Sequence, residues 1–365
     1  MERILESKEL VIFGVGDIGT DFYGRLKKCN YKGKICFCDN NIKKQGTCID
    51  GVEIVALDRA KEMLPNALYV ITVINHIEAV KRQLGQSNIP QQRILIFTKD
   101  DYINPVDKKM QEKIKQEYRT WCEKYNSKVV KLKDRFQGER CFIIGTGGSL
   151  TNEDLEKLQN EYTFGCNRLY KMFSELKWRP VFYCFYDAQR LEMLKKDLSY
   201  IIDNSDYVFT SSGIKDNIEN KYIDMDKMFF VHVEKEKYYP KLPKFSEDIE
   251  QCVYDGQTVI YMATQIAVYL GFKEIYYLGV DNHYSVELNL DGTVRYDAAV
   301  KDYPEQIGGM ELERSVIPQI ELTTMSFESV KQYADAHNIN VYNATRGGKL
   351  EVFERADLDE IIRRV

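Results

Sequence analysis

Short runs of apolar residues recur along the chain, and each is followed by a turn and then by polar and apolar residues at helical spacing. The run at residues 10–13, Leu-Val-Ile-Phe, has the length of a buried strand. Further runs of this kind lie at residues 34–38, 68–74, 93–97, 140–144, 162–166, 180–186, 207–210 and 275–280. Strands that alternate with helices predict an α/β fold with mostly parallel sheets.

A chain of 365 residues exceeds the usual size of one hydrophobic core, so two domains are expected. We place a Rossmann-like module at residues 1–103, a connector at 104–139 and a second Rossmann-like domain at 140–365. Apolar residues recur every three or four positions in the connector, which predicts an amphipathic helix joining the domains. These residues are Met110, Ile114, Tyr118, Trp121, Tyr125, Val129 and Leu132.

The first module contains the pattern strand, GxGxxG, helix, strand and acidic residue that is typical of dinucleotide-binding domains. Gly14 permits the tight turn, Gly16 lets a diphosphate approach the backbone, and Gly19 lets helix and strand pack closely. Asp39 stands where a carboxylate would bind a ribose. An NAD-like ligand is one interpretation. The other is a Rossmann-like module without a dinucleotide, because residues 38–54 resemble modules attached to bacterial polysaccharide-biosynthesis enzymes.

Composition narrows the classes of function. The net charge of −5 gives no general attraction to nucleic acid. The nine cysteines include no CxxC pair and no cluster with zinc spacing, so we expect reduced thiols and no metal bound by them. No apolar run approaches the length of a membrane span, and the N-terminus lacks the plan of a signal peptide. A cytoplasmic protein is therefore expected.

A second glycine-rich turn, Gly145-Thr-Gly-Gly-Ser149, follows the strand at 140–144. Thr151 and Asp154 have the spacing of a capping box, so a helix should begin there. Backbone N–H groups of such a turn favour an anion, and phosphate is the natural ligand. The turn is not a Walker loop, because no Gly-Lys-Ser/Thr sequence is present.

Polar residues follow several strands of the second domain, at the sheet edge where open α/β sheets bind ligands. We expect this edge to form the nucleotide site. The candidate residues are Gly145, Thr146, Gly147, Ser149, Asn167, Asp187, Gly256, Thr258 and Gly279.

Three blocks of the second domain, in order, resemble the MptE-like family, named after the 6-hydroxymethylpterin diphosphokinase of archaea. The blocks are residues 144–150, 270–281 and 341–348. They are also similar to bacterial CMP-sialic-acid-dependent sialyltransferases and to glycosyltransferases that modify flagellin. The resemblance covers about residues 140–355.

This resemblance implies roles for individual residues. In the sialyltransferases the glycine turn and the asparagine after the second strand hold CMP, which implies this role for Gly145, Thr146, Gly147, Ser149 and Asn167. Thr146 replaces the usual asparagine. The block around Thr258 matches the helix that meets the phosphate, and Asp281 matches the aspartate after the late strand.

The candidate catalytic residues are His283, Asp281 and Glu321. The family's histidine base precedes the last helix, where this chain has no histidine, and Glu321 lies nearest that position. His283 could deprotonate an acceptor hydroxyl, with Asp281 orienting it, or could be a surface histidine. Asp281 could instead bind magnesium between phosphates or cap a loop. Arg346 could pair with a phosphate or lie exposed in a turn.

We expect a glycosyltransferase of bacterial surface-polysaccharide or glycoconjugate synthesis, using a CMP- or CDP-linked sugar donor and a sugar acceptor. The alternatives are an ATP-dependent diphosphokinase, which would require magnesium, and a non-catalytic nucleotide-binding scaffold. A homo-oligomer is expected. The basic face of the connector could also attract a lipid-linked acceptor at a membrane surface.

Overall fold

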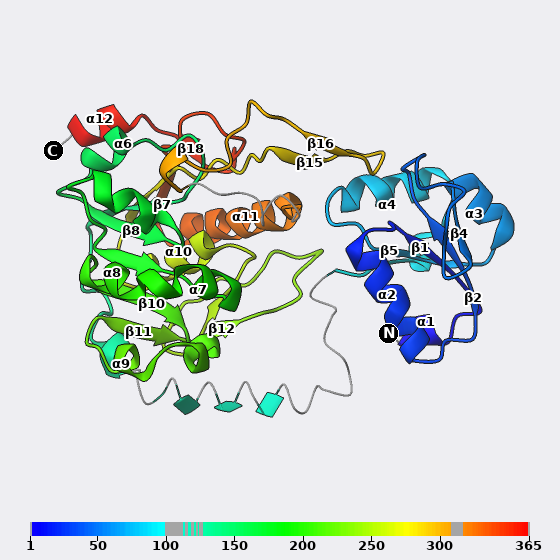
Figure 1. Ribbon diagram of the computed structural model, residues 1–365, viewed down its shortest axis with the longest axis horizontal. Helices are drawn as coiled ribbons and strands as arrows, with labels where there is room; N and C mark the ends of the chain where they lie inside the picture. Colours follow the sequence, from blue (N-terminus) through cyan, green and yellow to red (C-terminus); the bar gives the residue numbers. More distant parts are fainter. Residues whose placement is uncertain are drawn as a thin grey trace. The chain divides into compact units, whose positions relative to one another are not determined.

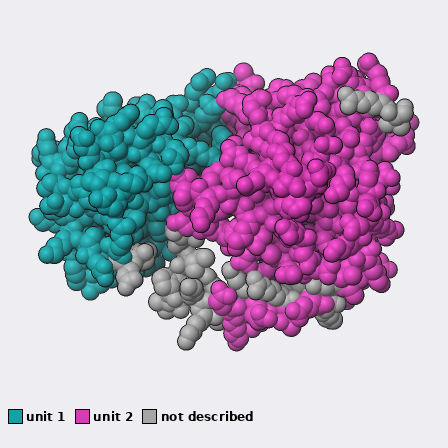
Figure 2. Space-filling view, turned by 180° about the vertical axis from the view of Figure 1, so that it is seen from behind, with its two compact units in different colours: residues 1–104, 286–297, 314–321 teal, residues 105–285, 298–313, 322–365 magenta. Residues whose placement is uncertain are grey.

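The computed structural model describes residues 2–98, 127–307 and 317–363, together with residues 112, 113, 116, 117, 120, 121 and 123. The chain forms two compact units, shown in Figures 1 and 2. Unit 1 comprises Met1–Asn104, Val286–Asp297 and Arg314–Glu321, and unit 2 comprises Pro105–Ser285, Ala298–Glu313 and Leu322–Val365. The predicted second domain ran unbroken to residue 365, whereas two of its segments belong to unit 1.

Unit 1 is built on a six-stranded sheet of order β3-β4-β2-β1-β5-β6, in which only the β3–β4 pair is antiparallel. Its strands are β1 (Glu9–Phe13), β2 (Lys34–Cys38), β3 (Cys48–Ile49), β4 (Val52–Val55), β5 (Leu68–Ile71) and β6 (Ile94–Ile96). Its helices are α1 (Glu2–Leu5), α2 (Asp17–Lys28), α3 (Leu57–Met63), α4 (Ile77–Gln86) and the 3₁₀ turn η1 (Gln91–Arg93). The predicted strands at 10–13 and 34–38 are confirmed.

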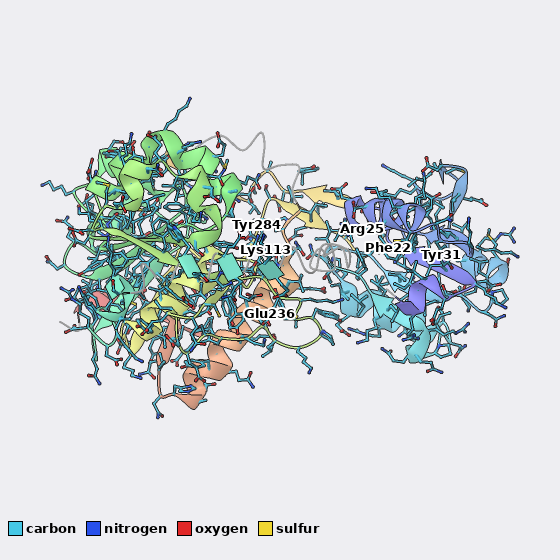
Figure 3. All side chains as sticks on the ribbon, turned by 90° about the horizontal axis from the view of Figure 1, so that it is seen from below. Phe22, Arg25, Tyr31, Lys113, Glu236 and Tyr284 are labelled. Carbon is cyan, nitrogen blue, oxygen red and sulfur yellow. The ribbon has the colours of Figure 1, made fainter. Side chains whose placement is uncertain are left out.

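Helix α2 illustrates how the helices cover this sheet. Phe22 lies fully buried in the core, while Arg25 forms an ion pair with Asp21 on the outer side (Figure 3). The helix begins at Asp17, and Gly16 is its N-cap. The glycine turn therefore leads directly into the helix, as a Rossmann-like unit requires.

Two further strands of unit 1 come from a distant part of the sequence. They are β15 (Val286–Leu288) and β16 (Val294–Tyr296), which form an antiparallel hairpin. The sequence analysis did not predict this hairpin.

Unit 2 is built on an eight-stranded sheet of order β11-β10-β9-β8-β7-β14-β17-β18, in which every neighbouring pair is parallel. Its strands are β7 (Arg140–Ile144), β8 (Tyr162–Cys166), β9 (Phe182–Cys184), β10 (Tyr207–Ser211), β11 (Met228–Val231), β14 (Glu274–Leu278), β17 (Asn340–Asn343) and β18 (Glu354–Arg355). A separate pair joins β12 (Val233–Glu234) to β13 (Val253–Tyr254).

Helices cover both faces of this sheet, so the predicted α/β class with mostly parallel sheets is confirmed. One face packs against α10 (Val259–Tyr269), α11 (Ile320–Ala336) and the segment from Val129 to Phe136. The other face packs against the elements α6 (Asn152–Glu156), η4 (Leu169–Glu175), α7 (Ala188–Leu194), α8 (Leu198–Asp203), η6 (Ser212–Asn217), α9 (Asn220–Ile223), η7 (Glu305–Ile307) and α12 (Leu358–Arg363). The 3₁₀ turn η5 (Lys195–Asp197) joins α7 to α8.

The core follows from the two-residue period of a strand. In β7, Cys141 and Ile143 point to the α10 face, and Phe142 and Ile144 point to the opposite face. All four side chains are fully buried, which explains why this strand reads as a continuous apolar run.

Most of the predicted connector helix lies outside the described residues, including Met110, Ile114, Tyr118 and Tyr125. Residues 127–130 are helical, and Leu132 lies in the turn that follows. Val129 and Leu132 both pack in the core of unit 2. In the part of the chain that the structure describes, no helix is long and apolar enough to cross a membrane.

Val129 and Val130 offer a matched test of this packing. Val129 is 1% exposed and Val130 is 46% exposed, although both are valines in the same helical turn. We expect Val129→Ala to lower the free energy of unfolding of unit 2 by about 2 kcal/mol, because a buried cavity remains. Val130→Ala should change it by less than about 0.5 kcal/mol. Denaturant unfolding followed by tryptophan fluorescence measures both, and equal losses would contradict the packing described.

Candidate functional site

The candidate site lies where the strand order of unit 2 reverses. From β7 the chain adds β8, β9, β10 and β11 on one side, and later β14, β17 and β18 on the other. The strands β7 and β14 are therefore neighbours, and the loops that follow them lead towards opposite ends of the sheet. In open α/β sheets such a switch point is the usual place for a ligand.

The glycine turn after β7 packs tightly against the loop after β14. The N–H of Gly145 donates to the carbonyl oxygen of Leu278 at 2.8 Å, and that of Gly147 to Gly279 at 2.8 Å. A Cβ on Gly145 would lie 2.3 Å from the carbonyl oxygen of Gly279. These glycines are therefore required by the close approach of two backbones, whatever ligand binds.

This packing changes the expected phosphate cradle. The N–H groups of Gly145, Gly147 and Ser149 all donate within the protein, so they do not form an open row of donors. Among the described residues, the N–H groups of Thr146 and Gly148 have no partner. An anion bound at this turn could therefore accept hydrogen bonds from those two N–H groups, and not from every N–H group of the turn.

Asp281 holds the glycine turn in place. Its Oδ2 accepts the N–H of Ser149 at 3.0 Å, and its Oδ1 accepts the Ser149 hydroxyl at 2.5 Å. Burial raises the pKa of the Asp281 carboxyl, while the bonds from Ser149 and the nearby His283 act in the opposite direction. In this structure both oxygens of Asp281 serve the turn. A role in orienting His283 stays a prediction.

The loop after β17 closes on Asp281 from the other side. The N–H of Val280 donates to the Thr345 hydroxyl at 3.0 Å, and that of Lys349 donates to the carbonyl oxygen of Asp281 at 2.7 Å. A Cβ on Gly348 would lie 2.6 Å from that same oxygen. The loop after β14 is thus held by its neighbours on both sides.

Arg346 forms an internal ion pair. Its guanidinium donates to both carboxylate oxygens of Asp154, at 2.8 Å and 2.5 Å. Asp154 completes the predicted capping box with Thr151, which is confirmed. Arg346 is exposed in a turn, as one interpretation predicted, and its guanidinium pairs with Asp154. Its pairing with a phosphate stays a prediction.

Asn167 lies directly after β8 with a left-handed backbone, φ +50°. Its side-chain oxygen Oδ1 is buried and has no hydrogen-bond partner among the described residues. A buried acceptor left unpaired is costly, so it is the kind of atom that a ligand's donor would satisfy. Sequence reasoning selected Asn167 from its place after a strand.

Sequence reasoning missed the residue beside Asn167. The guanidinium of Arg168 is buried and lies over the ring of Tyr303 at 4.5 Å from its centroid. The segment that carries Tyr303 also contains Asp302, whose carboxylate accepts the N–H and hydroxyl of Ser285 at 2.6 Å and 2.5 Å. No sequence signal linked residues 302 and 303 to residue 168, because they are far apart in the chain.

The remaining nucleotide candidates of unit 2 act at the starts of helices. Asp187 caps α7 by accepting the N–H of Arg190 at 2.7 Å. Thr258 caps α10 by accepting the N–H of Ile260 at 3.3 Å. Gly256 has φ +49°, and a Cβ there would lie 2.3 Å from Tyr261. Both helices begin at the carboxyl edge of the sheet.

His283 and Tyr284 follow Asp281 in the loop after β14. His283 is half-buried and near enough to lower the pKa of Asp281. Burial raises the pKa of the Tyr284 hydroxyl, aided by Asp302 and Asp281 and opposed by Arg190. The loop therefore places a histidine, a carboxylate and a tyrosine within electrostatic reach of one another.

Glu321 belongs to unit 1. Its carboxylate accepts the N–H of Ile77, the first residue of α4, at 2.9 Å. This contact places Glu321 at the start of a helix of unit 1. The catalytic role suggested for it stays a prediction.

In the N-terminal glycine turn, backbone conformation or close packing requires glycine at positions 14 and 19 but not at position 16. Gly14 has φ +105°, and a Cβ on Gly19 would lie 2.0 Å from the carbonyl oxygen of Gly14. A Cβ on Gly16 would meet nothing within 4 Å. Asp39 accepts the N–H groups of Val15 at 2.8 Å and Asn41 at 2.9 Å. Its carboxylate is thus already engaged by the protein.

Within the described residues, no group of three or more His, Cys, Asp or Glu side chains is placed to hold a metal ion. Asp281, considered for magnesium from the sequence, is engaged in the glycine turn, and the carboxylate of Asp187 caps a helix.

Gly147→Ala tests the close packing at the switch point. Its Cβ would lie 2.5 Å from the carboxyl carbon of Asp281, so we expect unit 2 to lose about 1–3 kcal/mol of unfolding free energy. Gly213→Ala is the control, because its Cβ would meet only the Ser211 hydroxyl at 3.2 Å. Denaturant unfolding measures both variants. A Gly147→Ala protein as stable as the control would contradict the packing described.

The raised pKa of Asp281 predicts a dependence of stability on pH. The folded chain holds this proton more tightly than the unfolded chain. The contribution of Asp281 is therefore fully present below the ordinary value of 3.8 and is lost as pH rises through the folded pKa. Relative to wild type, Asp281→Asn should thus gain stability as pH rises from 3.8 towards neutral. Denaturant unfolding over this range measures the difference. A difference that does not change with pH would contradict the prediction.

Structural comparison finds similarity to two kinds of solved protein. The MAf glycosyltransferase from Magnetospirillum magneticum AMB-1 is 16% identical, with a TM-score of 0.39; the match covers 96% of this chain and 58% of that one. The sialyltransferase CstII from Campylobacter jejuni, in complex with CMP-3FNeuAc, is 14% identical, with a TM-score of 0.35, and the match covers 60% of this chain and 86% of that one. At these TM-scores the similarities do not establish a shared fold.

No curated protein matches the sequence. A family model does match, and its description is 6-hydroxymethylpterin diphosphokinase MptE-like. The match covers residues 112–287, so it includes the glycine turn and the loop after β14 and ends before the third block at 341–348. The resemblance inferred from the sequence is thereby confirmed, and residues 112–287 of this chain match the MptE-like family.

Proposed function

We propose that unit 2 is a glycosyltransferase that takes a sugar from a nucleotide-sugar donor, with the nucleotide bound at the switch point between β7 and β14. The observation that carries this proposal is the buried, unpaired Oδ1 of Asn167 at the carboxyl end of β8. This acceptor suits a donor group on a ribose or base. The N–H groups of Thr146 and Gly148 suit an anionic phosphate.

The proposed chemistry requires three acts from the protein. It must hold the nucleotide, take a proton from the acceptor hydroxyl, and stabilise the phosphate that leaves with the nucleotide. His283 is our candidate base, since an imidazole nitrogen can accept that proton and His283 lies close enough to Asp281 to lower the pKa of that carboxyl. The acceptor oxygen then bonds to the sugar carbon, and the bond from that carbon to the phosphate oxygen breaks.

A cytidine nucleotide is the donor we favour. The residues 144–150, 270–281 and 341–348 resemble enzymes that use CMP-linked sialic acid. We further propose a role in bacterial surface-polysaccharide or glycoconjugate synthesis. We also propose that the acceptor is lipid-linked, that the chain forms a homo-oligomer and that the protein acts in the cytoplasm.

The second candidate is a magnesium-dependent diphosphokinase, and the description of the matching family favours it. It requires several carboxylates free to hold magnesium between phosphates. Asp187 and Asp281 are engaged within the protein, which makes this candidate the weaker one. A scaffold that binds nucleotides without catalysis is the third.

A thermal-shift panel separates these functions, with CMP, CDP, UDP, GDP and ATP each tested with and without magnesium. A ligand at 100 times its Kd should stabilise the fold by about 2.7 kcal/mol. Stabilisation by CMP or CDP without magnesium supports the glycosyltransferase. Stabilisation only by ATP, and only in the presence of magnesium, supports the diphosphokinase. No response to any nucleotide would favour the scaffold.

Asn167→Gly sharpens the test, because glycine keeps the left-handed backbone and removes the side-chain amide. We expect affinity for the cytidine nucleotide to fall by up to about tenfold. Asn338→Gly is the matched control, since Asn338 has φ +55° and an exposed side chain in unit 2. Calorimetric titration measures both. Equal affinities in the two variants would argue against nucleotide binding at Asn167.

A further inference from the structure

The carboxyl edge of the unit 1 sheet is where a dinucleotide would lie in a Rossmann-like domain. Strand β1 stands between β2 and β5, so the order of strands reverses there. The glycine turn follows β1, Asp39 follows β2, and His76 lies in the loop after β5. These three loops lie at the place where the sequence pattern put an NAD-like ligand.

The hairpin β15–β16 lies against these loops within unit 1. The side-chain amide of Asn40 donates to the carbonyl oxygen of Leu290 at 3.2 Å, and that of Asn41 donates to Gly292 at 3.2 Å. The Nε2 of His76 is hydrogen-bonded to the carbonyl oxygen of Leu288. Side chains after β2 and β5 thus bind alternate carbonyls along the hairpin.

The hairpin tip meets the residue that would bind a ribose. A Cβ on Gly292 would lie 2.8 Å from Oδ1 of Asp39 and 3.3 Å from Asn41. Gly292 has φ +74°, so both its conformation and its surroundings call for glycine. The backbone of the tip therefore stands within contact distance of the Asp39 carboxylate.

A second segment is bound beside the hairpin. The side-chain amide of Asn75 donates to the carbonyl oxygen of Pro318 at 2.7 Å, and Glu321 accepts the N–H of Ile77. Polar side chains and backbone after β5 therefore hold residues that come from the second half of the chain. Such contacts are those of a built peptide-binding surface.

We propose that the loops at the carboxyl edge of the unit 1 sheet are a binding site for the chain's own hairpin, residues 286–297, which lies where a dinucleotide would lie. The hairpin follows directly on Ser285, whose contacts with Asp302 join the two ends of the inserted segment. Asn40, Asn41 and His76 position the hairpin within unit 1.

Hydrogen exchange on the full chain tests this proposal, with Gly292→Asn and Gly51→Asn as a matched pair. Both glycines have left-handed backbones, φ +74° and +80°, but a Cβ on Gly51 would meet nothing within 4 Å. Gly292→Asn should raise amide exchange of residues 286–296 by about tenfold. Gly51→Asn should leave exchange of this segment unchanged. Unchanged exchange in Gly292→Asn, or an equal rise in Gly51→Asn, would overturn the proposal.

Slow amide exchange in β1 and β2 shows whether unit 1 of the Gly292→Asn protein still folds. If that slow exchange is lost, Asn41→Ala decides, because it removes one bond to the hairpin without a steric clash. It should raise exchange of residues 286–296 several-fold, and no rise would overturn the proposal. NAD is the third probe. The wild-type chain should show no NAD-dependent protection at residues 14–19, and such protection would prove this edge of the sheet open to a dinucleotide.

Discussion

The close approach of the loops after β7 and β14 is the constraint on which the candidate site depends. Two backbones meet there with no room for a Cβ on Gly145 or Gly147, and the Asp281 carboxylate fastens Ser149 across the gap. Burying that carboxylate costs free energy, as its raised pKa reflects, and the two bonds from Ser149 offset part of this cost. The position of His283, two residues later, follows from this fixed point.

The same arrangement shows why residue types that are common in catalytic sites can have structural roles. Arg346, Asp187 and Thr258 are residue types that bind phosphates, metals and ribose. Here they form an ion pair and two helix caps. Each of these contacts satisfies a backbone or side-chain group at the crowded carboxyl edge of the sheet, where buried polar groups need partners. Asn167 is different, because its Oδ1 is buried without one.

Unit 1 shows the same contrast between sequence motif and structural role at the carboxyl edge of its sheet. Its glycine turn has the geometry of a dinucleotide-binding domain, since Gly14 and Gly19 serve strand, turn and helix packing. Asp39, however, accepts N–H groups from its own loop and stands beside Gly292 of the hairpin. A motif can thus preserve the fold of a nucleotide-binding unit while its ligand face meets protein.

The sequence by itself determined the strands at 10–13, 34–38, 140–144 and 162–166, the capping box at Thr151 and the α/β class, because these depend on local apolar patterns and short-range bonds. It also directed attention to the carboxyl edge of the second sheet. Only the tertiary structure decided that Asp281 holds Ser149, that Arg168 meets Tyr303 and that residues 286–297 join unit 1. Those contacts join residues far apart in the chain, and no local pattern of hydrophobic and polar positions encodes which partners meet.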